Sequence, residues 1–216
     1  MSPDDPSPDD KEERHPAVTS PTEQLATALA ATVEGKSARR SSPPRQDGWH
    51  PGARLGATAE HGALLAYNDF GADGICVLQE GRGVWLNEQR DGHKRDFTHR
   101  PYSVWQWMPS YNGKPTWLMG ALAPEAARLE LVGDDGAVVE ADVVDHTFAG
   151  AIEVDMVSLR NAKERLEATE ATSEEGRAEF EKLLADSREE MAKVKVRVYD
   201  SADTLLYDGA AINSTD

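Results

Sequence analysis

Short apolar segments recur along the chain between residues 63 and 154, separated by turn-forming Gly, Asp and Asn residues. A repeat of about 8–12 residues is typical of a β-sandwich or a β-barrel. The clearest turn is Gly133-Asp134-Asp135-Gly136, within Ala127–Val144, and it predicts an antiparallel hairpin. The other expected strands in this region are Ala63–Tyr67, Gly74–Gln79, Gly83–Asn87, Tyr102–Met108, Pro115–Leu122 and Thr147–Val154.

The strand pattern returns near residue 194. Val194–Tyr199 alternates valines with Lys195 and Arg197, which predicts a strand with one buried face and one face in solvent. Asp200–Asp203 then predicts a turn into a last strand at Thr204–Tyr207. Together with the earlier segments, these features predict a mainly β, antiparallel, immunoglobulin-like sandwich.

Two regions have helical rather than strand periodicity. Ser20 and Glu23 form a capping-box pattern, and the apolar residues after them predict a short helix over residues 21–34, packed weakly on its own domain. Between residues 156 and 193, helical spacing predicts an inserted pair of helices at Val157–Glu170 and Ser173–Ala192. We expect this pair to lie against the sheet surface as a helical hairpin, with a dimerising coiled coil as the alternative.

Composition divides the chain into two parts. Residues 1–47 are expected to comprise a disordered acidic tail, the short helix and a basic, proline-containing linker. Residues 48–216 are expected to form one sandwich domain that carries the helical insertion. The single cysteine, Cys76, lies in an expected strand, so we expect a buried structural thiol and no intrachain disulfide.

Charge narrows the range of partners. The formal net charge is −16, and an acidic chain repels phosphate backbones, so nucleic-acid binding is not expected. The sequence shows neither a signal-peptide pattern nor a run of about 18 apolar residues. We therefore expect no membrane association, and a cytoplasmic location is predicted.

Aromatic and cationic residues are concentrated between Trp85 and Trp117, which holds seven of the chain's 14 Phe, Trp and Tyr residues. Aromatic faces supply contact area and cations orient a ligand, so this region is the best candidate for a binding site. Trp105 and Trp107 flank Gln106 and are expected to share one strand face, where the hydrophobic core is the competing explanation. The candidate ligand-binding residues are Trp85, Arg90, His93, His99, Trp105 and Trp107.

Catalytic and metal sites have less support. His93, Asp96 and His99 could in principle converge, but their spacing matches no specific zinc motif, and no nucleophile pairs with them. The sequence also lacks the G-x-S-x-G, P-loop, dinucleotide-binding, H-E-x-x-H and C-x-x-C patterns. We therefore expect no catalytic residue, no metal site and no cofactor.

Three stretches carry a resemblance to known proteins. They are Trp117–Ala127 with the following GDDG turn, Asp145–Ala149, and Val196–Asp200. Over roughly the last 100 residues, this combination resembles a group of uncharacterised actinobacterial β-sandwich proteins. The resemblance implies an immunoglobulin-like sandwich and no activity, so it supplies no functional residue. The helical insertion departs from the short loop that the group implies.

These features favour a non-enzymatic binding or protein-interaction module. Its expected partner is another protein, or a second copy engaged through the helical insertion. One alternative is a small hydrolase or ligand-processing enzyme with a site near Trp85–Trp117, which requires His93, Asp96 or His99 to meet in a pocket. The other alternative is a purely structural domain.

Overall fold

The computed structural model describes residues 20–38, 44–56, 61–111, 114–168 and 174–212. Within these ranges the protein is mainly β, with three four-stranded antiparallel sheets and three α-helices. The disorder expected for residues 1–19 lies outside the described residues. No helix of the described chain is long and apolar enough to cross a membrane.

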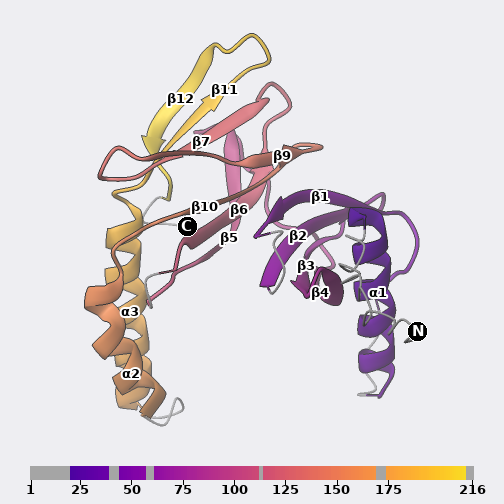
Figure 1. The fold of residues 1–216 in the computed structure, drawn as a ribbon, viewed down its shortest axis with the longest axis horizontal. Coiled ribbons are helices and arrows are strands. Elements are labelled where there is room, and N and C mark those ends of the chain that lie inside the picture. The colour runs from indigo at the N-terminus through magenta and orange to yellow at the C-terminus, as the bar shows by residue number, and fades with distance from the viewer. Residues whose placement is uncertain (1–19, 39–43, 57–60, 112–113, 169–173, 213–216) are drawn as a thin grey trace, which may run out of the picture.

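The first sheet is a meander in which four consecutive strands pair in the order β1-β2-β3-β4. Helix α1 covers the face of this sheet that points away from the rest of the molecule (Figure 1). Leu64 and Cys76 point towards α1, whereas Ala63 and Leu65 point towards the second sheet. The bounds are α1 (Pro21–Ala38), β1 (Trp49–Leu55), β2 (His61–Asn68), β3 (Asp73–Gln79) and β4 (Arg82–Gln89).

The second and third sheets pack face to face. The second has the order β5-β6-β10-β9 and the third has the order β12-β11-β7-β8. Their shared core contains Leu118 and Phe148 from the second sheet and Leu129 and Val196 from the third. The strands are β5 (Tyr102–Met108), β6 (Thr116–Leu122), β7 (Arg128–Val132), β8 (Val138–Glu140), β9 (Asp142–Val144), β10 (Thr147–Ile152), β11 (Lys195–Tyr199) and β12 (Leu205–Ala210).

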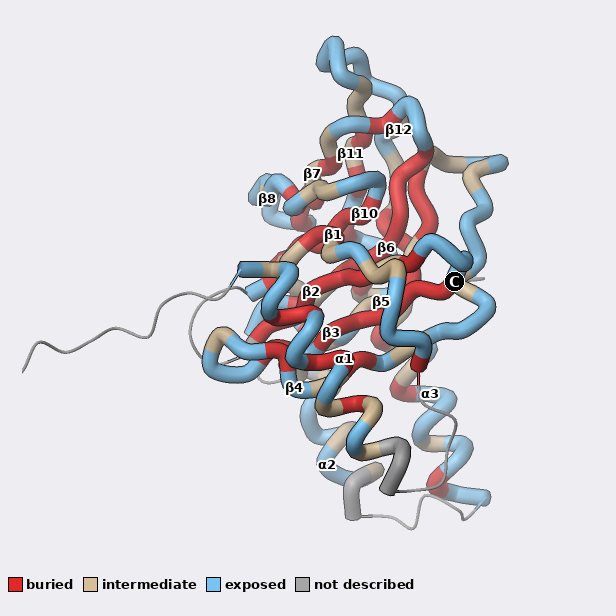
Figure 2. The backbone as a smooth tube through the Cα atoms, turned by 90° about the vertical axis from the view of Figure 1, so that its right-hand side faces the viewer, coloured by how far each residue is buried: buried red, intermediate tan, exposed pale blue. Residues whose placement is uncertain are grey.

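The second sheet is therefore the middle layer, and buried residues are concentrated in the strands (Figure 2). Its other face meets the first sheet through Met119 and Ala149. Polar contacts hold this junction, because Thr147 Oγ1 accepts a hydrogen bond of 2.8 Å from the backbone N–H of Ala53. A Cβ added at Gly52 would lie 2.4 Å from the same hydroxyl oxygen, so β1 and β10 approach closely only because residue 52 is glycine.

The predicted capping box is confirmed and the helix is longer than expected. Ser20 N–H donates to Glu23 Oε2 at 2.8 Å and Glu23 N–H donates to Ser20 Oγ at 3.3 Å, which satisfies two donors at the start of α1. The helix continues through Gly35 to Ala38. Helix α1 packs closely on β4 rather than weakly, since a Cβ added at Gly83 would lie 1.9 Å from the backbone oxygen of Gln24 in the helix.

The predicted hairpin is confirmed in its first half and divided in its second. β7 and β8 pair across the turn, where Gly136 has a φ of 82° and donates its N–H to Gly133 O at 3.0 Å. The chain then leaves the third sheet at the buried Ala141, and β9 pairs with β10 in the second sheet. The second arm of the expected hairpin is therefore divided into two strands, β8 in the third sheet and β9 in the second.

The inserted helices differ from the expectation. The chain between β10 and β11 forms a 3₁₀ turn (Val157–Leu159), α2 (Arg160–Ala168) and α3 (Glu174–Met191). The two α-helices lie side by side and project away from the sheets (Figure 1). Helices α2 and α3 contact each other, and only the end of α3 reaches the sheets, where Met191 lies in the core between the second and third sheets. The expected packing of the whole pair on a sheet surface is therefore not seen in the described residues, and the buried residues of α3 form a narrow stripe. These residues are Gly176, Leu183, Ser187 and Met191.

Candidate functional site

A β-bulge in β5 separates the two tryptophans expected to share a strand face. Val104 pairs with Gly120 and Gln106 pairs with Met119, so Trp105 is an extra residue on its strand. Trp105 packs against the first sheet, whereas Trp107 packs on the core between the second and third sheets. The prediction that Trp105 and Trp107 share one strand face is therefore wrong, because a bulge shifts the alternation of side chains by one residue.

His93 and Trp105 are the two candidate residues that the structure brings together. The His93 ring stacks on Trp105, with centroids 5.1 Å apart and planes inclined by 10°. The carboxylate of Asp73, whose side chain is only 1% exposed, accepts hydrogen bonds from the His93 ring Nδ1 and, at 2.8 Å, from the His93 backbone N–H. The guanidinium of Arg95 lies 4.0 Å from the same carboxylate. Asp73 was not singled out from the sequence, in which it lies directly before the expected strand Gly74–Gln79.

In the described part of the chain, the Asp73–His93 pair is not extended by a hydroxyl or thiol into a nucleophile–His–Asp arrangement. Among the described residues, no side-chain hydroxyl or thiol is hydrogen-bonded to His93. The nearby Ser103 Oγ donates to Lys94 O at 2.6 Å. Burial raises the pKa of the Cys76 thiol to about 12, and this side chain faces α1 rather than His93. The pair instead anchors the loop between β4 and β5 onto the first sheet.

The other candidate residues have separate neighbours. Trp85 lies beside Gly35 of α1, where an added Cβ would be 3.4 Å from the indole ring. Arg90 Nε lies 3.4 Å from the carboxylate of Glu88. His99 lines a separate pocket of about 280 Å³ near β12. The structure therefore does not assemble the six candidate residues into one site.

The possible metal ligands are also dispersed. Asp96 is exposed, and its hydrogen bonds with Thr98, followed by that with Lys94, lower the pKa of its carboxyl group to about 2. His93 is bound to Asp73 instead of Asp96. The described part of the chain contains no group of three or more His, Cys, Asp or Glu side chains suited to holding a metal ion.

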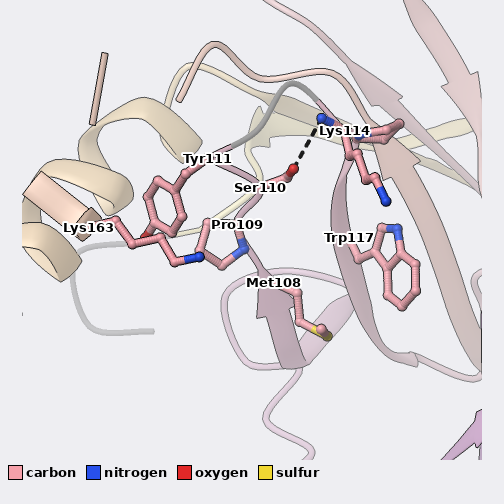
Figure 3. A pocket seen from close by; sticks show the side chains of 8 residues that line it. Met108, Pro109, Ser110, Tyr111, Lys114, Trp117 and Lys163 are labelled. Carbon is pink, nitrogen blue, oxygen red and sulfur yellow. Dashed lines mark hydrogen bonds between the residues drawn. The ribbon is translucent and has the colours of Figure 1, made fainter. Parts of the chain in front are cut away.

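A recess that combines aromatic and cationic side chains lies at the end of the β5–β6 hairpin, beside α2 (Figure 3). We call it the lysine-lined pocket; its volume is about 220 Å³. It combines apolar and aromatic surfaces with two ammonium groups, and none of its lining residues carries a carboxylate. The lining residues are Met108, Pro109, Ser110, Tyr111, Lys114, Pro115, Trp117 and Lys163.

Hydrogen bonds to both inserted helices position Tyr111 at the wall of this pocket. Ser187 Oγ in α3 donates to Leu183 O at 2.6 Å, so the 2.9 Å contact between Tyr111 OH and Ser187 Oγ has the tyrosine as donor. Arg160 Nε in α2 donates to Tyr111 O at 3.0 Å. The ammonium of Lys163 lies 5.7 Å from the centre of the tyrosine ring, within range of a cation–π interaction.

The opposite wall comes from the β5–β6 hairpin itself. Lys114 N–H donates to Ser110 Oγ at 3.2 Å, which shapes the turn (Figure 3). Met108 is 42% exposed, and Trp117 is partly buried against the first-sheet side of the core. Chemically, this arrangement suits an anionic ligand with a flat apolar part, since lysines attract the charge while the rings and the thioether supply contact area.

Sequence reasoning reached only part of the lysine-lined pocket. Tyr111 and Trp117 lie within the aromatic-rich stretch, but Lys163 comes from the inserted helix and has no local signal that connects it to Tyr111. Comparison of the whole chain with models of known protein families, with curated proteins and with solved structures yields no match. The interpretation of the pocket therefore rests on its own residues.

Proposed function

We propose that the protein is a non-enzymatic protein-interaction module that binds acidic peptide segments in the lysine-lined pocket. The observation that carries the proposal is the composition of the pocket lining: it includes Lys114 and Lys163 and no acidic residue, in a chain with a net charge of −16. A local cationic site attracts anionic partners, whereas the acidic remainder of the protein surface repels them. Anionic partners are therefore directed to this site.

The apolar part of the pocket favours a peptide over a small inorganic anion. Met108 and Trp117 offer surface that a free anion cannot use, and proline-containing segments pack well on aromatic side chains. Each exposed ion pair contributes only about 0.2–1 kcal/mol, so the two lysines alone give weak binding. The aromatic contacts are needed for useful affinity, which makes an acidic, proline-containing peptide the best-matched ligand.

The scaffold of this site is proposed to be an immunoglobulin-like sandwich formed by β5–β12. The orders β5-β6-β10-β9 and β12-β11-β7-β8 correspond to the A-B-E-D and G-F-C-C′ arrangement of that fold. In this interpretation the helical pair is an insertion in the E–F connection, and it supplies one wall of the pocket. The proposal that the module is an interaction protein then explains why the insertion projects beyond the sheets.

Fluorescence polarisation with a labelled (Pro-Asp-Asp)₄ peptide tests this function, with (Pro-Lys-Lys)₄ as the ligand control. A salt concentration of about 0.1 M limits electrostatic interactions to about 10 Å, so that the pocket outweighs the distant acidic surface. We expect Lys114→Glu/Lys163→Glu to weaken binding at least ~10-fold, since two attractions become repulsions.

The matched control is Lys195→Glu, which changes an exposed lysine on β11, away from the pocket lining. It should change the affinity less than ~2-fold, because a single exposed charge outside the pocket is screened. Equal losses in the two variants would show a general charge effect and refute the pocket, as would an absence of binding to the wild-type chain.

A further inference from the structure

We infer that residues 2–10 of this chain occupy the lysine-lined pocket and compete with external acidic peptides; this rests on the proposed function. The segment reads SPDDPSPDD and therefore contains Ser-Pro-Asp-Asp twice, with no cation. No other stretch of the sequence combines prolines with paired carboxylates in this way. The chain thus carries its own ligand of the class that the pocket favours.

The two partners are complementary in detail. Each Ser-Pro-Asp-Asp unit places one proline ring beside two adjacent carboxylates. In the pocket, Lys163 lies beside Tyr111 on one side, and Lys114 lies with Trp117 on the other (Figure 3). A proline ring on the tryptophan with flanking aspartates near the lysines uses both features, whereas neither feature alone would distinguish this segment from the other acidic stretches of the chain.

The connection to α1 is long enough for this contact. Ser20, where the described structure begins, lies fifteen residue steps after Asp5, and at about 3.5 Å per step these span up to about 52 Å. Passing from α1 across the first sheet to the second takes about 20 Å, since packed layers lie about 10 Å apart. Following the seven residues of β5 adds about 24 Å.

Occupation by the chain's own segment makes the pocket self-inhibited. A tethered ligand acts at an effective concentration on the order of millimolar, so it weakens the apparent affinity for an external peptide without any other change. The apparent dissociation constant for the external peptide rises at least ~2-fold when the effective concentration of the segment reaches or exceeds the segment's own dissociation constant. A partner with a longer or more acidic segment would displace it.

The test uses the full chain and the labelled (Pro-Asp-Asp)₄ peptide. In Asp4→Asn/Asp5→Asn/Asp9→Asn/Asp10→Asn the internal competitor is neutral, and we expect the external peptide to bind at least ~2-fold more tightly than to wild type. The matched control replaces the same four aspartates by glutamates, which keeps the charge and should keep the wild-type affinity. Adding Lys114→Glu/Lys163→Glu to either variant should abolish the difference between them.

The outcomes separate this inference from the proposed function. Equal binding to the wild-type and asparagine variants would overturn self-occupation while leaving the pocket as a peptide site. Absence of binding to both would overturn the two together. Sedimentation that finds a wild-type dimer, which dissociates in the asparagine variant, would assign the segment to a second copy and overturn occupation by the same chain.

Discussion

Replacing His93 by alanine tests whether the Asp73–His93–Trp105 cluster is a structural anchor. The substitution removes the ring that is hydrogen-bonded to the buried Asp73 and stacked on Trp105. A hydrogen bond to a charged group contributes about 1.5–3 kcal/mol and a ring pair about 0.5–1.5 kcal/mol. The His93 backbone N–H and Arg95, at 4.0 Å, still stabilise the carboxylate, so we expect a loss in the lower half of that sum, about 2–3 kcal/mol.

Urea denaturation monitored by tryptophan fluorescence measures this loss as a shift of the midpoint at constant slope. His99→Ala is the matched control, because it removes the same side chain from an exposed position in the same loop and should cost less than about 0.5 kcal/mol. A cycle with Asp73→Asn should give a coupling of about 1–2 kcal/mol between residues 73 and 93. Equal losses for His93→Ala and His99→Ala, or no coupling to Asp73, would refute the anchor.

Two further predictions follow from close packing and from a shifted pKa. Gly83→Ala should destabilise the protein by at least about 2 kcal/mol, because the added Cβ would lie 1.9 Å from Gln24 O. Gly35→Ala should instead stabilise α1 by about 0.5–1 kcal/mol, because the added Cβ would lie at an ordinary 3.4 Å from Trp85. Urea denaturation should therefore show free-energy changes of opposite sign for the two variants. The pKa of Asp96, held at about 2 chiefly by Thr98, should rise towards 3.8 in Thr98→Ala by NMR titration. Because that folded-state pKa is depressed, the stability contributed by Asp96 should be complete above about pH 4 and lost as the pH falls through 2; an unchanged titration in Thr98→Ala would contradict the assignment to Thr98.

Features specified by neighbouring residues were predicted correctly. The capping box at Ser20 and Glu23, the turn at Gly133–Gly136 and the alternation in Val194–Tyr199 all appear as expected. Each depends on hydrogen bonds or side-chain alternation within a few residues, so the local sequence contains the information. The first strand was missed, because Pro51 and Gly52 interrupt the strand pattern that β1 nevertheless adopts, with a bulge after Pro51.

Features that depend on distant partners were not predictable in the same way. The bulge at Trp105 exists only in its pairing with β6, so the spacing of Trp105 and Trp107 suggested one face when there are two. Asp73 became part of the His93 cluster through pairing within the first sheet and the return of the following loop. A single-residue shift in register is enough to reassign a side chain to another layer.

The sequence by itself determined an acidic, mainly β, antiparallel chain with helices at its start and before its last two strands, and an aromatic-rich region worth searching. Only the tertiary structure decided that the strands form three layers, that the six candidate residues do not form one site, and that Lys163 meets Tyr111 beside Trp117. Local patterns are set by hydrogen bonds and burial over a few residues. A pocket requires side chains from separate elements to converge, and that geometry is set by how the layers and the inserted helices pack.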